Sequence, residues 1–125
     1  MGFRNPSNSK ILSFKYALVG IATALKEEPN MKFHFFVGLT VIVASVLFGI
    51  SKQDWIAVIF LIGFVISLEL TNTAIEAVVD AFTDREHPGA KLAKDIAAGA
   101  VLIAAATSAI LGFIIFIPYI RTWIM

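Results

Sequence analysis

The 125-residue chain contains no cysteine, and only 15% of its residues are charged. The missing cysteines exclude disulfides, thiolate metal ligands and thiol nucleophiles, so its chemistry depends on oxygen and nitrogen groups. The net charge is +1 and the basic residues form no run with interleaved aromatics, so we expect no nucleic-acid partner. Neither common glycine-rich nucleotide-binding motif is present.

Hydrophobic residues make up 58% of the chain and the mean hydropathy is +0.85. This balance is typical of an integral membrane protein. Apolar runs long enough to cross a hydrocarbon core of ~30 Å occupy residues 31–50, 55–79 and 96–117. We therefore predict a single all-α domain over residues 1–125 with three transmembrane helices.

Residues 10–28 precede these spans and repeat apolar side chains at helical spacing, with basic residues largely elsewhere on the wheel. The pattern predicts an amphipathic helix on the membrane surface, preceded by a polar start over residues 1–9. Pro29 is expected to end this helix and turn the chain into the bilayer. Trp55 and the segment from Pro118 to Trp123 are expected at an interface.

Basic residues are distributed unequally between the two ends of the spans. Two of them, Lys52 and Arg121, belong to one side, and eight belong to the other: Arg4, Lys10, Lys15, Lys26, Lys32, Arg85, Lys91 and Lys94. Because cytoplasmic segments carry the excess of Lys and Arg, the N-terminus and the 81–95 loop are predicted to be cytoplasmic.

Carboxylates interrupt the second span on one helix face. Glu69, Asn72, Glu76 and Asp80 are spaced i, i+3, i+7 and i+11, which places them in a stripe about 80° wide. Counted from Trp55, Glu69 lies roughly 21 Å deep and Glu76 roughly 31 Å, near the cytoplasmic boundary. Ionisable groups inside the hydrocarbon are expensive and indicate function, although Glu69 and Asn72 could merely join helices by hydrogen bonds.

The same counting places four further side chains with Glu76 at the cytoplasmic level: Glu28, His34, Lys94 and Asp95. Glu69 then lies beneath them. His34 is more readily a polar residue at the start of its span than a ligand contact. Lys94 and Asp95 are equally consistent with an ion pair involving Lys91 and with an active site.

This two-level arrangement suits a reaction between a lipid and a water-soluble phosphate donor. An acid within the lipid could accept a proton from a lipid hydroxyl, and acids at the boundary could hold Mg²⁺ and its phosphates. A small transporter or proton pathway would also explain Glu69, but it leaves the boundary charges unexplained. A third possibility, an inert helical scaffold, predicts that Glu69→Leu is stabilising and has no phenotype.

The stripe sequence Glu-Leu-Thr-Asn-Thr-Ala-Ile-Glu-Ala-Val-Val-Asp at residues 69–80 resembles the prokaryotic diacylglycerol kinase family. His87-Pro88 and Ala93-Lys94-Asp95-x-Ala-Ala-Gly-Ala-Val-Leu extend the resemblance, which covers residues 14–103. Residues 30–34 and 97–99 look like the Gram-positive branch, often called undecaprenol kinases.

The resemblance implies a homotrimeric lipid kinase of the bacterial plasma membrane that uses ATP and Mg²⁺. By position, it assigns Glu69 as the catalytic base and Glu28 and Glu76 as metal ligands. It assigns Asn72, Asp80, Lys94 and Asp95 to the nucleotide side of the active site. The implied substrate is undecaprenol, with diacylglycerol as the alternative.

Overall fold

The structure, a computed structural model, describes residues 6–125, which form four α-helices: α1 (Pro6–Glu27), α2 (Pro29–Phe48), α3 (Lys52–Phe82) and α4 (Pro88–Ile124). Helices α2, α3 and α4 are each long and apolar enough to cross a membrane. The predicted all-α fold with three spanning helices is thus confirmed. The expected polar start before residue 6, including Arg4, lies outside the described residues.

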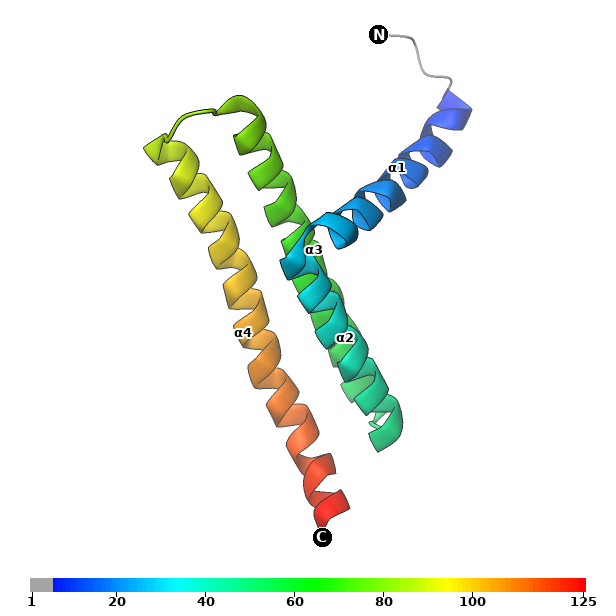
Figure 1. The fold of residues 1–125 in the computed structure, drawn as a ribbon. Helices are drawn as coiled ribbons and strands as arrows, with labels where there is room; N and C mark the ends of the chain where they lie inside the picture. The colour runs from blue at the N-terminus through cyan, green and yellow to red at the C-terminus, as the bar shows by residue number, and fades with distance from the viewer. Residues whose placement is uncertain (1–5) are drawn as a thin grey trace.

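Helix α3 is the central element of the bundle, because it packs against both α2 and α4 (Figure 1). The three helices run lengthwise beside one another, whereas α1 projects away from them at a steep angle (Figure 1). Helix α1 contacts α2 and α3 only near its C-terminal end, and its apolar side chains Phe14 and Leu18 are exposed. Its placement on a membrane surface stays a prediction.

The junction between α1 and α2 is a single extended residue, Glu28, with φ −100° and ψ 115°. A proline disfavours helical backbone in the residue before it and is itself well suited to the first turn of the next helix. Pro29 therefore breaks the helix where the sequence predicts. Helix α1 begins at Pro6 rather than near Lys10, because proline is equally compatible with its first turn.

The turn between α2 and α3 is defined by two cap residues. Gly49 adopts the left-handed conformation with φ 62° and ψ 49°, and its N–H donates to the carbonyls of Ser45 and Val46. The Ser51 hydroxyl accepts the N–H of Asp54 at 3.2 Å and starts α3. Helix α2 consequently ends at Phe48, two residues before the expected limit of the first span at Ile50.

Helix α4 continues beyond the predicted limit of the third span. The sequence places that limit at Ile117, but the helix passes through Pro118 and ends at Ile124. Proline removes one backbone hydrogen bond, a loss that helices in membrane proteins tolerate when neighbouring groups compensate. The carbonyl that loses its donor is that of Ile114, one turn before Pro118.

This extension carries Tyr119 to the turn between α2 and α3. The Tyr119 hydroxyl donates to Asp54 Oδ2, and it accepts the Ser51 N–H at 2.9 Å. The three groups form a clasp that joins the C-terminal end of α4 to the start of α3. Two elements far apart in sequence are thereby held in one register at this end of the bundle.

Tyr119→Phe removes the clasp hydroxyl while keeping the ring. We expect it to destabilise the folded protein by about 1–2 kcal/mol, because the part-buried Asp54 carboxylate loses its donor. Denaturant unfolding in detergent micelles measures the change. Thr122→Val is the matched control, since its hydroxyl bonds only within α4; equal stability of Tyr119→Phe and the wild type would contradict the clasp.

Candidate active site

The acidic stripe on α3 passes from the buried interior to an exposed end. Glu69 is 2% exposed and Asn72 is 5% exposed, whereas Glu76 is half-buried. The Asp80 side chain is 65% exposed. Helix α3 therefore presents carboxylates both to the buried interior and to the exposed end of the bundle, as the spacing predicts.

Glu69 has a basic partner on the neighbouring helix. His34 Nε2 of α2 lies 3.8 Å from Glu69 Oε2, and the two side chains are 15% and 3% exposed. The prediction that His34 lies at the level of Glu76 is wrong, because the register between α2 and α3 places it beside Glu69. Counted from Ser51, His34 lies roughly 25 Å deep, which differs from the roughly 21 Å of Glu69 by less than one helical turn and could have indicated this pair.

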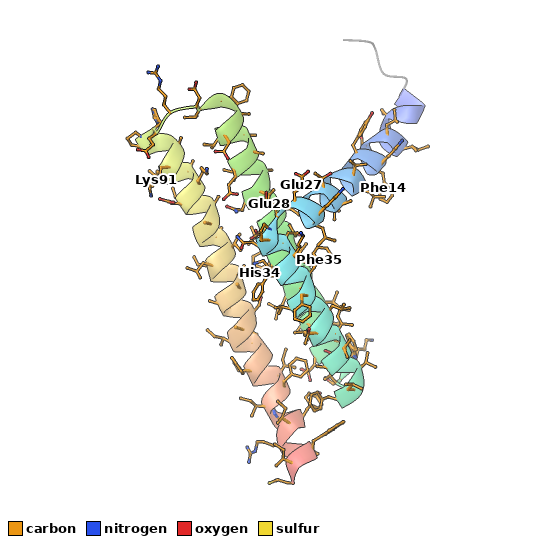
Figure 2. All side chains as sticks on the ribbon, viewed as in Figure 1. Phe14, Glu27, Glu28, His34, Phe35 and Lys91 are labelled. Atoms are coloured by element: carbon orange, nitrogen blue, oxygen red, sulfur yellow. The ribbon has the colours of Figure 1, made fainter. Side chains whose placement is uncertain are left out.

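Two more carboxylates lie within electrostatic range of Glu69: Glu76 on α3 and Glu28 at the α1–α2 junction. Glu28 is half-buried, and the extended backbone before Pro29 holds it where α1 and α2 meet (Figure 2). Two acids and one histidine from three segments thus lie within electrostatic range of Glu69. We call Glu28, His34, Glu69 and Glu76 the buried acidic group.

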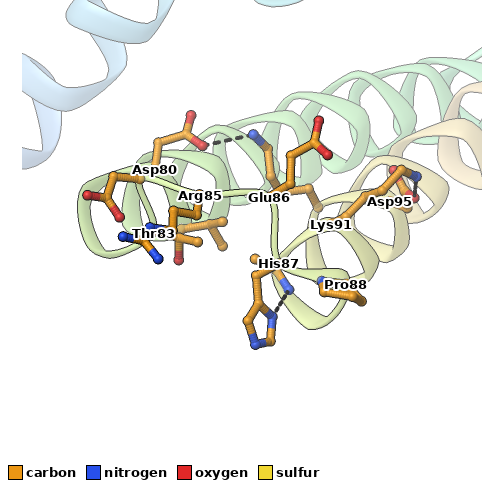
Figure 3. Close-up of a pocket in the computed structure, with 12 residues that line it drawn as sticks. Asp80, Thr83, Arg85, Glu86, His87, Pro88, Lys91 and Asp95 are labelled. Carbon is orange, nitrogen blue, oxygen red and sulfur yellow. Dashed lines mark hydrogen bonds and ion pairs between the residues drawn. The ribbon is translucent and has the colours of Figure 1, made fainter.

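A second set of charges lies where α3 ends and α4 begins. Lys94 Nζ donates to Asp80 Oδ1 at 2.8 Å and joins the two helices, while Lys91 pairs with Asp95 one turn away on α4 (Figure 3). These residues and the 83–88 loop line an open cavity of about 720 Å³. Asp95 therefore makes the ion pair with Lys91 that was one of the two alternatives predicted from the sequence. Lys94 instead pairs with Asp80 on α3.

His87 determines where α4 begins. Its Nδ1 accepts the N–H groups of Gly89 at 3.0 Å and Ala90 at 3.3 Å (Figure 3). The imidazole thereby caps two of the backbone donors that a helix start leaves without partners. Pro88 occupies the first helical position, where it costs no hydrogen bond.

Glu76 links the two sets of charges. It interacts electrostatically with Glu69 in the buried acidic group and also with Lys94 beside the cavity. One carboxylate on α3 thus lies between the apolar interior and the open, charged cavity. This position suits a group that acts on a ligand entering from the water side.

Three buried polar atoms have no hydrogen-bond partner within the described chain: Asn72 Oδ1, Thr73 Oγ1 and Ser108 Oγ. Buried polar atoms are normally satisfied, so each of these has capacity for a ligand or a second chain. The sequence singles out Asn72. The sequence analysis does not identify Thr73 and Ser108 as candidate site residues. A hydroxyl in a helix commonly bonds to the backbone of its own helix, so its presence in the sequence does not indicate a free polar atom.

The carboxylates are of the type that binds Mg²⁺, but no cluster of three His, Cys, Asp or Glu able to hold a metal ion occurs between residues 6 and 125. Mg²⁺ is commonly bound by one or two carboxylates together with substrate phosphates. Glu28 and Glu76, both half-buried and both near Glu69, fit that mode. These two carboxylates would therefore bind Mg²⁺ together with substrate phosphates and would not supply all of its ligands.

The fold and the site define a helical membrane protein with a buried carboxylate adjoining a charged, open cavity. The profile of the prokaryotic diacylglycerol kinase family matches residues 15–116. The chain is 44% identical to undecaprenol kinase of Bacillus subtilis over 92% of its length and 94% of that protein. It is 34% identical to diacylglycerol kinase of Haemophilus influenzae over 75% of its length and 80% of that protein.

A third relative, diacylglycerol kinase of Synechocystis, is 41% identical over 86% of this chain and 62% of its own length. The chain belongs to the prokaryotic diacylglycerol kinase family. It is a lipid kinase, and membership of a kinase family implies ATP-dependent phosphorylation.

The exposed Asp80–Lys94 pair should add little to stability. A double-mutant cycle with Asp80→Ala and Lys94→Ala is expected to give a coupling free energy close to zero, because solvent screens both groups. Chemical unfolding in micelles measures it, and the same cycle on Lys91 and Asp95 is the control. A coupling free energy well above that of the Lys91–Asp95 pair would show instead that the Asp80–Lys94 pair is a structural support.

Proposed function

We propose that this chain phosphorylates undecaprenol at its hydroxyl group, using ATP with Mg²⁺, and that diacylglycerol is the second candidate substrate. The observation that carries the proposal is the one face of α3 that presents the buried Glu69, the half-buried Glu76 and the exposed Asp80, which pairs with Lys94 beside the charged cavity. Such a site meets a membrane-dissolved alcohol at one end and a water-soluble phosphate donor at the other. The 44% identity to the Bacillus protein named undecaprenol kinase favours undecaprenol.

Glu69 is the catalytic base in this proposal. Its carboxylate accepts the hydroxyl proton as the lipid oxygen forms a bond to the γ-phosphorus of ATP, and the bond from that phosphorus to the β–γ bridging oxygen breaks. ADP leaves with the electron pair. The free Asn72 Oδ1 lies one turn along α3 and provides an acceptor for the substrate.

Glu28 and Glu76 are the proposed ligands of the Mg²⁺ that accompanies ATP. A magnesium ion held there would offset the negative charge of the phosphates and of the transition state. Lys94 is proposed to contact the phosphates and Asp95 to belong to the same side of the site. Because the exposed Asp80–Lys94 pair is weak, phosphate oxygens can take the place of Asp80 at the ammonium group.

The proposal includes the membrane arrangement and the assembly. In this proposal the N-terminus and the 81–95 loop lie in the cytoplasm of a bacterial cell, with α1 on the inner face of the plasma membrane, and the excess of basic residues supports this orientation. A homotrimer with composite sites is implied by the family resemblance. The unpartnered polar atoms of Asn72, Thr73 and Ser108 support it, since a second chain could satisfy them.

The purified protein should transfer phosphate from Mg²⁺-ATP to undecaprenol, and do so with a higher kcat/KM than to diacylglycerol. Radiolabelled ATP and separation of lipid products measure both reactions in mixed micelles. A preference for diacylglycerol would make the second candidate the substrate. Transfer to neither lipid alcohol would refute the proposal.

Glu69→Gln and Glu76→Gln should affect different steps. Glu69→Gln is expected to lower kcat by about 10²–10⁴ while leaving ATP binding intact, because it removes a general base. Glu76→Gln should weaken Mg²⁺-ATP binding about tenfold or more, because one ligand charge is lost. Calorimetric titration together with steady-state kinetics separates the two effects; an equal loss of both functions in both variants would contradict the assigned roles.

A further inference from the structure

An apolar groove runs along the three spanning helices, separate from the charged cavity. It has a volume of about 490 Å³, and α2, α3 and α4 each contribute to its wall. On α4 the lining extends from Ala105 to Ile120, which corresponds to roughly 22 Å along the helix axis. Because the groove follows helices that span the membrane, it runs in the direction in which hydrocarbon chains lie in a bilayer.

The groove offers very few polar side chains. Among its described lining residues, only His34 and Ser108 carry a polar side chain, and the rest are aliphatic, aromatic or glycine. His34 also lies 3.8 Å from Glu69, which does not itself line the groove. The imidazole is therefore the point where the apolar groove adjoins the buried acidic group.

We propose that this groove holds the hydrocarbon tail of the lipid alcohol and that His34 positions the terminal hydroxyl against Glu69. The inference rests on the proposed function and identifies the tail site and the specificity of that reaction. Continuity carries the argument: a tail that fills the groove ends at His34, one side chain away from the proposed base. His34 is thus a positioning residue, and Glu69 accepts the proton.

The scarcity of polar groups also discriminates between substrates. A polyprenol carries its hydroxyl directly on the hydrocarbon, so its only polar atom meets His34. Diacylglycerol would bring two ester groups and a second tail to a wall that offers Ser108 and His34 alone. Polar atoms buried without partners are costly, so the groove favours a single-chain alcohol.

A spanning helix of a second copy is the other occupant that an apolar groove could take. The two occupants can be distinguished with a lipid probe. A protein helix in the groove would cover Val37, Ile62 and Gly112, whereas a groove that takes a lipid tail leaves them accessible to the probe. A long-chain alcohol with a photoreactive diazirine on its tail, added to the wild-type protein, therefore tests the proposal without any variant. Mass spectrometry should find label on these groove residues above that on the exposed, outward-facing Phe36 and Leu39.

Two glycines provide a matched pair for the kinetic test. A Cβ added at Gly112 or at Gly63 would meet no atom within 4 Å, but only Gly112 lines the groove. Gly112→Leu should raise KM for the lipid alcohol about tenfold and leave KM for ATP unchanged, because its side chain occupies tail space. Gly63→Leu should leave both constants as in the wild type.

His34 variants test the positioning role in the same assay. His34→Leu should lower kcat for the lipid alcohol about tenfold or more with ATP binding unchanged, and His34→Gln should restore part of the loss through its amide group. Preferential labelling outside the groove, or a Gly112→Leu enzyme with wild-type lipid KM, would overturn the tail site. Wild-type kcat in His34→Leu would overturn the positioning role. Failure of the tail site or of the positioning role leaves the proposed function intact as long as the wild-type protein transfers phosphate to the lipid alcohol. Absence of transfer by the wild type refutes the proposed function itself.

Discussion

The burial of the Glu69 carboxylate is the constraint on which the arrangement of the helices depends. A carboxylate in apolar surroundings requires a partner, and the described chain supplies one basic group, His34, at 3.8 Å. That contact requires α2 to pack beside α3 in one register. The same register brings Glu28, immediately before Pro29, into electrostatic range of Glu69.

Helix α3 also connects two environments, the apolar interior around Glu69 and the exposed end at Asp80. Helix α3 has 31 residues, more than a hydrocarbon core of ~30 Å requires, so its last turns extend beyond the apolar region. Glu69 lies in the buried part and Asp80 in the exposed part, with Glu76 between them. The helix thus fixes the separation between a buried and an exposed carboxylate, which in the proposed function serve the lipid hydroxyl and the nucleotide phosphates.

Much of this fold could be predicted because its signals are local. Hydropathy gives the spans, and Pro29 gives the break that produces Glu28 as a junction residue. The stripe on α3 follows from helical spacing alone. The Lys94–Asp80 pair depends on the register between α3 and α4, which no local pattern encodes. For the His34–Glu69 pair, counting residues along each helix gives similar depths but not which helices are neighbours. The passage of α4 through Pro118 likewise depends on its surroundings, because the clasp at Tyr119 needs the extra turn.

The lack of a glycine-rich phosphate loop is understandable in this architecture. Such loops bind phosphate through free backbone N–H groups, and in a helical membrane protein nearly all of these groups are engaged within helices. The start of α4 is the nearest candidate beside the cavity, yet His87 already accepts the N–H groups of Gly89 and Ala90. In the proposed function, phosphate recognition therefore depends on side chains. Lys94 and Lys91 both line the cavity and each pairs with an exposed carboxylate, so either ammonium group can exchange its partner at small cost. The proposed function assigns the phosphates to Lys94.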